Sequence, residues 1–254
     1  MSSLELLLKQ LDKDRLPGHV GIIMDGNGRW AESKGIARLA GHREGSKAVR
    51  AITRFSRKIG IKALTLYAFS SQNWQRPADE VAGLMALLRE YLVSERSEIM
   101  DNDIRLNALG NLDRLPRMVR EPLDALMDES RENSSMTLSL ALSYGGRDDI
   151  LSACRSLLKD GIQPEELDED LFESRLCTHG LPPLDLIIRT SGEQRISNFM
   201  LWQNAYSELY FSDILWPDFR EEEFVRALLD YQTRERRCGK TSEQIRLEAA
   251  AGTA

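Results

Sequence analysis

The sequence contains little cysteine and little histidine, with three residues of each in 254. Cys154, Cys177 and Cys238 have neither CxxC spacing nor a neighbouring histidine pattern. Zinc sites and the disulfide frameworks of small secreted domains both depend on such spacings. We therefore predict neither, and this cysteine usage is typical of a chain in a reducing cytosol.

Long hydrophobic runs are also missing. The longest uncharged stretches, 63–75 and 133–146, are shorter than the roughly 20 apolar residues of a membrane-spanning helix. The N-terminus lacks the basic region followed by an apolar region that marks an export signal. We expect a soluble, cytoplasmic protein that is not exported.

The charge distribution is uneven. A formal net charge of −6 argues against general nucleic-acid binding, so we expect no nucleic-acid partner. From residue 29 to residue 58, however, nine lysines and arginines stand against only Glu32 and Glu44, a local charge of +7 (nine minus two). This run permits two interpretations, a solvated basic helix face or a site for a compact polyanion.

Short apolar segments alternate with helical patterns along the chain. One helical pattern ends at Gly60, and a second follows Pro77. The segments that have the character of strands are Val20–Met24, Ala63–Phe69, Ile104–Leu109, Met136–Leu142, Leu184–Ile188 and Leu209–Phe211. This alternation predicts an α/β fold, a mainly parallel six-stranded sheet flanked by helices. Because internal repeats and flexible linkers are absent, we expect a single domain.

In such a sheet, ligands bind beyond the carboxyl ends of the strands. This rule singles out four segments: Asp25–Trp30, Ser70–Arg76, Tyr144–Arg147 and Arg189–Ser197. The first, DGNGRW, joins an acid to a glycine loop whose amides suit a phosphate, but it matches neither a Walker motif nor GxGxxG. A tight turn between strand and helix would also explain its glycines.

Asp25 would repel a phosphate unless a cation lay between them. Mg²⁺ binds one or two carboxylates together with phosphate oxygens and waters. We therefore predict that Asp25 holds Mg²⁺, which in turn holds a phosphate group. Glu208, near a short apolar strand, fits either a surface or capping residue or a second metal ligand.

Two later segments carry further polar groups. FSSQNWQRP, residues 69–77, combines hydroxyl, amide, indole and guanidinium groups, although Trp74 alone fits a core aromatic and Asn73 a turn or helix cap. Arg189, Arg195 and Ser197 form a candidate second phosphate site, because arginine binds phosphate oxygens in a bidentate manner. Two anion sites imply two phosphorylated substrates.

Six motifs, in order, carry a resemblance to a known family. They are HVGIIMDGNGRWA, GHREGSKAVR, LTLYAFSSQNWQRP, YGGRDDI, DLIIRTSGEQRISNFMLWQ and AYSELYFSDILWPDF, within the stretch from about His19 to Gly239. Together they resemble the cis-prenyltransferases. The trans-prenyl synthases use DDxxD motifs instead, whereas here Asp148 and Asp149 are followed by Ile, Leu and Ser.

The resemblance implies sequential cis-condensation of isopentenyl diphosphate onto (2E,6E)-farnesyl diphosphate. The product would be undecaprenyl (C55) diphosphate, the lipid carrier precursor for peptidoglycan and other cell-wall glycans. The resemblance also implies a homodimer that depends on Mg²⁺. Two alternatives stay open: a shorter-chain cis-prenyl diphosphate synthase, which shares every catalytic motif, and a catalytically silent partner subunit.

Residue by residue, the resemblance implies catalytic roles for Asp25 and Asn73, with Asp25 and Glu208 at the metal. The allylic-substrate contacts match Gly26, Asn27, Gly28, Arg29, Trp30, Arg38 and His42. The second loop matches Ser70, Ser71, Gln72, Trp74 and Arg76. The isopentenyl diphosphate site matches Arg189, Arg195, Ile196 and Ser197. The acceptor of the substrate proton stays open between a diphosphate oxygen and Asp25, helped by Asn73.

Two features near the end of the chain bear on the resemblance. Gln194 stands where some relatives carry a histidine implicated in metal binding, so we leave it out of the metal set. The tripeptide Arg237–Gly239 matches the family's RxG element, which reaches into the partner subunit's site. We expect a helical or flexible segment at 1–18, the catalytic domain at 19–239 and a tail at 240–254.

A C55 chain favours a dry tunnel, because each buried methylene contributes about 0.8 kcal/mol. The helix from Val81 to Leu92 and the strand from Met136 to Leu142 are candidate walls, with Met136 near the far end. The same residues would look identical in an ordinary core. The leucine-rich start, from Leu4 to Leu11, fits a packed or flexible helix, or a transient contact with the inner face of the plasma membrane.

Overall fold

The computed structural model describes residues 2–235, 241 and 244. Six strands form one sheet: β1 (His19–Ile23), β2 (Ala63–Ser70), β3 (Ile104–Leu109), β4 (Met136–Tyr144), β5 (Leu186–Arg189) and β6 (Glu208–Phe211). The ends of each strand lie within two residues of those predicted from the apolar segments. The six-stranded α/β sheet is therefore confirmed.

The strand order is β3-β4-β2-β1-β5-β6, and all neighbouring strands run parallel. The chain builds from β1 toward one edge and then crosses to β5 on the other side, so the order reverses at β1. Such a reversal leaves a crevice beyond the carboxyl ends of the strands. Ile23 is level with Arg189, which places the loops after β1 and β5 next to each other.

The helices of the described residues connect these strands. They are α1 (Ser3–Leu8), α2 (Asn27–Ser33), α3 (Arg38–Ile59), α4 (Ala78–Ser94), α5 (Arg96–Asp101), α6 (Arg117–Glu129), α7 (Gly146–Lys159), α8 (Glu169–Glu173) and α9 (Glu221–Thr233). α3 ends at Gly60, as predicted. The φ of Gly60 is 105°, in the left-handed region that glycine adopts without strain.

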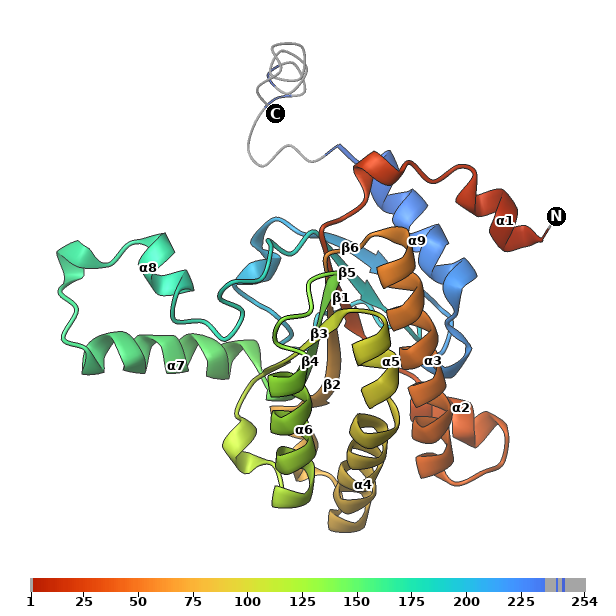
Figure 1. Ribbon diagram of the computed structural model, residues 1–254, viewed down its shortest axis with the longest axis horizontal. Helices are drawn as coiled ribbons and strands as arrows, with labels where there is room; N and C mark the ends of the chain where they lie inside the picture. The colour runs from red at the N-terminus through yellow and green to blue at the C-terminus, as the bar shows by residue number, and fades with distance from the viewer. Residues whose placement is uncertain (1, 236–240, 242–243, 245–254) are drawn as a thin grey trace.

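The long helices α3, α4, α6 and α9 stand along one face of the sheet (Figure 1). The largest buried cluster lies between them and the strands, and it includes Ile52 and Phe55 of α3 and Met85 and Leu92 of α4. The opposite face is covered mainly by irregular chain. Phe199, from the segment between β5 and β6, packs there with a second cluster of buried residues.

α7 and α8 extend away from the sheet as an arm (Figure 1). Phe172 of α8 and the Trp202 ring pack together at its base. The arm also exposes large apolar side chains: Leu158 is 78% exposed, and Leu151 and Leu167 are about half exposed. If these side chains form one contiguous apolar patch, the arm is a candidate surface for contact with another protein.

The basic run from residue 29 to residue 58 lies mostly on α3. Arg50 forms a two-pronged ion pair with buried Glu95, and similar pairs join α3 to α4 and α5. These residues therefore form an ion-paired helix face. The polyanion interpretation remains relevant at the start of the run, where Arg29 and Arg38 lie beside the candidate site.

The leucine-rich start forms a packed helix. Leu4, Leu7 and Leu8 pack against the main core, where α1 contacts α9, and Leu11 is buried. Leu6 is half exposed. None of the helices described here combines the length and the apolar character that a membrane span requires.

Candidate active site

Asp25 lies just beyond the carboxyl end of β1, where the strand order reverses. Its main-chain N–H donates to Thr190 Oγ1 at 2.9 Å, and the Thr190 hydroxyl donates to the main-chain oxygen of Asp25 at 2.7 Å. The Asp25 carboxylate accepts bonds from the Gly26 N–H and from Arg189, each at 2.8 Å. Since 34% of the side chain stays exposed, its free lone pairs are open to a ligand.

Two glycines shape the turn from Asp25 into α2. Gly26 has a φ of 106°, which a residue with a Cβ atom adopts only with strain. A Cβ atom on Gly41 of α3 would lie 2.1 Å from the main-chain oxygen of Asn27. α3 therefore fixes the first turn of α2 beside Asp25. The first N–H groups of a helix lack partners within it, so the predicted loop 26–29 is suited to an anion.

Arg29, in the first turn of α2, reaches the loop after β5. It donates to Ser191 Oγ at 2.5 Å and lies 3.4 Å from the Glu193 carboxylate. Glu193 also forms an ion pair with Arg195. Two arginines predicted for different phosphate sites thus contact a single carboxylate.

Arg189 is buried, with 4% of its side chain exposed. It donates to Ser197 Oγ and to the main-chain oxygen of Arg195, both at 2.5 Å, in addition to Asp25. Ile196, between them, packs against the second cluster of buried residues. The Arg189 guanidinium therefore joins Asp25 to loop 195–197, while its Nε has no hydrogen-bond partner, and its contact with a diphosphate stays a prediction.

A cavity of about 180 Å³ lies between β2, β4, α3 and α4, and we call it the apolar cavity. Four predicted site residues, Asn27, His42, Asn73 and Arg76, line it. Most of the other lining side chains are apolar: Met24, Val49, Leu66, Phe69, Leu84, Met85, Leu87, Leu88, Leu140 and Leu142. The structure therefore brings residues from separate sequence motifs to one cavity.

Arg38 and Arg76 share a carboxylate close to this cavity. Glu80 lies 3.4 Å from the Arg38 guanidinium and 2.9 Å from that of Arg76. Gly28 lets Arg38 approach α2, since a Cβ atom there would lie 2.9 Å from the Arg38 guanidinium carbon. The loop glycine, the two arginines and Glu80 form one charged cluster at the start of α4.

His42 lies beside these arginines. Burial lowers the pKa of His42 to about 4, with Arg76 and Arg38 acting in the same direction and Glu80 opposing them. The imidazole is therefore neutral near pH 7, and each ring nitrogen is free either to donate or to accept a hydrogen bond.

We predict that His42→Gln makes the protein less sensitive to acid. Between pH 6.5 and about 4 the unfolded chain binds a proton at His42 that the folded chain does not, so the stability of the folded protein falls as the pH falls. The wild type should lose about 2–3 kcal/mol of unfolding free energy in this way, and the variant should not. Urea unfolding at pH 7.5 and 4.5 measures it. The exposed His179 supplies the control variant, His179→Gln, and an equal loss in both variants would contradict the prediction.

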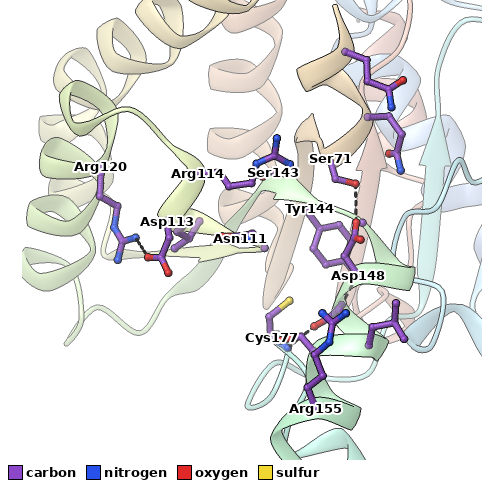
Figure 2. Close-up of a pocket in the computed structure, with 18 residues that line it drawn as sticks. Ser71, Asn111, Asp113, Arg114, Arg120, Ser143, Tyr144, Asp148, Arg155 and Cys177 are labelled. Carbon is purple, nitrogen blue, oxygen red and sulfur yellow. Dashed lines mark hydrogen bonds and ion pairs between the residues drawn. The ribbon is translucent and has the colours of Figure 1, made fainter.

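The second predicted loop divides between two cavities. Asn73 accepts a hydrogen bond from the Ser70 N–H at 3.0 Å, which caps the short helix η2 (Ser71–Gln75), and lines the apolar cavity. Ser71 and Gln72 instead line a polar cavity of about 860 Å³ at the ends of β3 and β4. Ser71 donates to the Asp148 carboxylate of α7 at 2.7 Å (Figure 2).

Both predicted tryptophans anchor the site loops. Trp74 packs against Phe69 and donates to Ser143 Oγ at 2.9 Å, which agrees with the core-aromatic interpretation, and its contact with substrate stays a prediction. Trp30 donates to the Asp218 carboxylate at 2.9 Å. Neither indole lines the apolar cavity.

Glu208 lies apart from Asp25, the other predicted metal ligand. It is level with Leu186 and hence with Val20, at the amino-terminal end of the sheet. Asp25 lies five residues further along the strand direction, roughly 16 Å away at about 3.3 Å per residue. Glu208 pairs with Arg234 at 2.8 Å. Within one chain, Glu208 therefore lies far from Asp25, and its place at the metal stays a prediction.

Other expectations concern the metal set and the chain end. The described residues contain no group of three or more acidic, histidine or cysteine side chains arranged to hold a metal. Gln194 is exposed. The RxG element, Arg237–Gly239, lies outside the described residues, as does most of the predicted tail.

Sequence reasoning missed several residues that hold the site together. Thr190, Ser191 and Glu193 all bond to Asp25, Arg29 or Arg195, and Glu80 joins Arg38 to Arg76. The first three directly follow a predicted strand that ends at the ligand edge, which is a usable signal. Glu80 offered no such signal, because an acid in the first turn of a helix is commonplace.

An acid surrounded by arginines at a strand reversal, next to an apolar cavity, has the chemistry of a site for a substrate with a phosphorylated head and an apolar tail. The comparisons agree with this class. The family model described as "Putative undecaprenyl diphosphate synthase" matches residues 23–239. The chain belongs to this family of cis-prenyltransferases.

Individual relatives are similar along most of their length. An isoprenyl transferase of Chlorobaculum tepidum is 52% identical over 235 residues, covering 91% of this chain and 89% of the relative. One from Geobacter sulfurreducens is 50% identical over 236 residues, covering 91% and 96%.

Two solved structures are also similar. Lavandulyl diphosphate synthase from Lavandula x intermedia, in complex with dimethylallyl diphosphate, has a TM-score of 0.85 and 38% identity, covering 88% of this chain and 98% of that one. A probable undecaprenyl diphosphate synthase from Campylobacter jejuni has a TM-score of 0.74 and 32% identity, covering 88% and 99%.

Proposed function

We propose that the protein condenses isopentenyl diphosphate onto (2E,6E)-farnesyl diphosphate to give undecaprenyl (C55) diphosphate, a lipid carrier precursor for cell-wall glycans. One observation carries the proposal. The partly exposed carboxylate of Asp25 lies among Arg29, Arg189 and the first turn of α2, and its neighbours Met24 and Asn27 line the apolar cavity. A diphosphate head and a prenyl tail fit these two surroundings.

Mg²⁺ fits the donor set in one particular way. Asp25 is a single carboxylate, and each of its oxygens already accepts one hydrogen bond, so it makes a poor site for a free ion. A metal that brings diphosphate oxygens and waters needs only one or two protein carboxylates. Asp25 would hold such a metal, which supplies positive charge beside the departing diphosphate.

The chain's own residues would bind and orient the two substrates. Arg29, Arg38 and Arg76 place positive charge where the allylic diphosphate leaves, and such preorganised charge stabilises a transition state more than water does. Neutral His42 offers a hydrogen bond to the same group without a further charge. Asn73 lies at the apolar cavity, where its amide orients the reacting end of a chain.

The apolar cavity must enlarge to hold a long product. Its volume of about 180 Å³ is below the roughly 300–1,000 Å³ of ordinary ligand pockets. α4 supplies Leu84, Met85 and Leu88 to one wall, and of these only Met85 is fully buried. We propose that α4 moves away from the sheet as the chain grows.

We predict that Met136→Trp shortens the products. Met136 is 1% exposed, at the start of β4 and beyond the Leu140 that lines the apolar cavity, so a larger ring there blocks the direction of growth. Overpacking also costs about 1–3 kcal/mol of stability. Chromatography of the products measures chain length. The matched control is Met118→Trp, at a half-exposed position of α6, and an unchanged product ladder in Met136→Trp would refute the assignment.

We also propose that the enzyme is a homodimer. The exposed leucines of the α7–α8 arm offer an apolar contact surface. If Glu208 contributes to the metal site, it does so in the other subunit, because it is far from Asp25 in its own chain. Sedimentation analysis of the protein and of Leu158→Glu tests the arm, which is 78% exposed at this residue.

A shorter-chain product is the second candidate. The small apolar cavity and the similarity to lavandulyl diphosphate synthase favour it. Incorporation of radiolabelled isopentenyl diphosphate with farnesyl diphosphate, with and without Mg²⁺, separates the possibilities. C55 products support the main proposal and shorter ones the second. No incorporation by the folded protein would favour a catalytically silent partner subunit.

A further inference from the structure

Glu193 connects the arginines of two predicted diphosphate sites. Its carboxylate lies 3.4 Å from Arg29, in the loop after β1, and forms an ion pair with Arg195, in its own loop after β5. The two arginine side chains are about half exposed, at 47% and 60%, and so are open to a ligand. The carboxylate thus neutralises two guanidinium groups that a bound diphosphate would otherwise contact.

The loop that carries Glu193 is held against Arg29 by a second contact. Ser191 accepts a hydrogen bond from Arg29 at 2.5 Å, with its backbone at a φ of 77°, where only glycine is free of strain. The main-chain N–H of Ser191 donates to the Ile214 oxygen at 2.8 Å, and that of Gly192 to the Ser212 oxygen at 2.8 Å. The backbone just before Glu193 is therefore held in place, so rotation of the side chain is the simplest way for the carboxylate to leave the arginines.

We propose that Glu193 is an internal counter-ion, which holds Arg29 and Arg195 together when diphosphate is absent and is displaced when diphosphate binds. This inference rests on the proposed function, because it assigns diphosphates to these arginines. Glu193 is a positioning residue: it acts through the arginines and takes no part in bond making or breaking.

Displacement couples the two sites. A diphosphate that binds Arg29 removes one of the two partners of Glu193, so the carboxylate is held less firmly at Arg195. The second diphosphate then meets an arginine that is easier to free. By linkage, the effect is reciprocal for the two ligands. Glu80 also contacts two arginines, Arg38 and Arg76, but neither belongs to the loop after β5, so Glu80 does not connect the two predicted diphosphate sites.

Binding of inorganic pyrophosphate tests the proposal without any turnover. Isothermal titration in metal-free, low-salt buffer compares the wild type with Glu193→Gln, which keeps the side-chain size and removes the charge. We expect pyrophosphate to bind the variant about three- to tenfold more tightly, the range expected from one or two partly exposed ion pairs. The control is Glu90→Gln, which removes an exposed pair with Arg43 on α3 and α4 and should leave the affinity unchanged.

A double variant shows whether the effect passes through Arg195. In an Arg195→Gln background, Glu193→Gln should raise the affinity for pyrophosphate by a clearly smaller factor. One of the two arginines that pair with the Glu193 carboxylate is then missing. Unchanged or weaker pyrophosphate binding in Glu193→Gln, or no binding to the wild type, would overturn the proposal. If the wild type makes prenyl products but Glu193→Gln binds pyrophosphate no more tightly, only the counter-ion role is rejected. If the wild type binds pyrophosphate but makes no prenyl product, the proposed function is rejected.

Discussion

Asp25→Ala should lower the rate of isopentenyl diphosphate incorporation by at least about 10²–10³-fold, the usual effect of removing one preorganised charge-stabilising group. The carboxylate faces Arg29 and Arg189 at the strand reversal, and it is the proposed metal ligand. Its loss also removes one of the partners of the buried Arg189 guanidinium. The variant thus loses the proposed metal contact and some order in the loop after β5.

Steady-state incorporation at saturating Mg²⁺ and substrates measures this effect as a fall in kcat. Asp128→Ala, at an 81% exposed position of α6, is the matched control and should keep wild-type activity. Circular dichroism confirms that the variants are folded. A folded Asp25→Ala protein that retains more than about a tenth of the activity would contradict the assigned role.

Arg189→Ala should reduce both activity and stability, whereas Arg195→Ala should reduce activity alone. Arg189 is 4% exposed and donates to Asp25, Ser197 and a main-chain oxygen, so its loss breaks a buried network at a cost of about 2–3 kcal/mol. Its activity should fall about 10²-fold or more, because Asp25 loses the partner that orients it. The Arg195 side chain is 60% exposed, and its removal should change stability by less than about 0.5 kcal/mol.

Urea unfolding and incorporation assays, run on both variants, provide the two readouts. For Arg195→Ala we expect the main effect in the KM for isopentenyl diphosphate. Equal losses of stability in the two variants would show that the buried and exposed arginines do not differ in the way that the structure indicates. Arg189→Lys adds a further check, because it keeps the charge but cannot make the same set of bonds.

The sequence predicted the sheet and the location of the ligand edge because both depend on local patterns. Each strand is a short apolar run, and Asp25 follows one of them directly. Register and strand order depend on contacts between distant segments, so they could not be predicted in this way. The role of Glu208 came from the family resemblance, and no local pattern indicated that Glu208 lies far from Asp25 within one chain.

Side-chain direction was the second limit. Residues 71–76 form one short motif, yet Asn73 and Arg76 line the apolar cavity while Ser71 lines the polar one. Trp74 points to a third environment, beside Phe69 and Ser143. A turn of 3-10 helix sends neighbouring residues in different directions, and the sequence alone gave no means of choosing among them.

The close approach at Gly41 has a consequence for how such an enzyme can change through evolution. Because α2 and α3 meet with no room for a Cβ atom, the half of the molecule that carries the charged groups tolerates few substitutions at this contact. α4 lines the apolar cavity with side chains that are mostly only partly buried, so it accepts changes in size more readily. Descendants of one ancestor can therefore diverge in the length of chain they make by altering α4, while inheriting the same diphosphate chemistry.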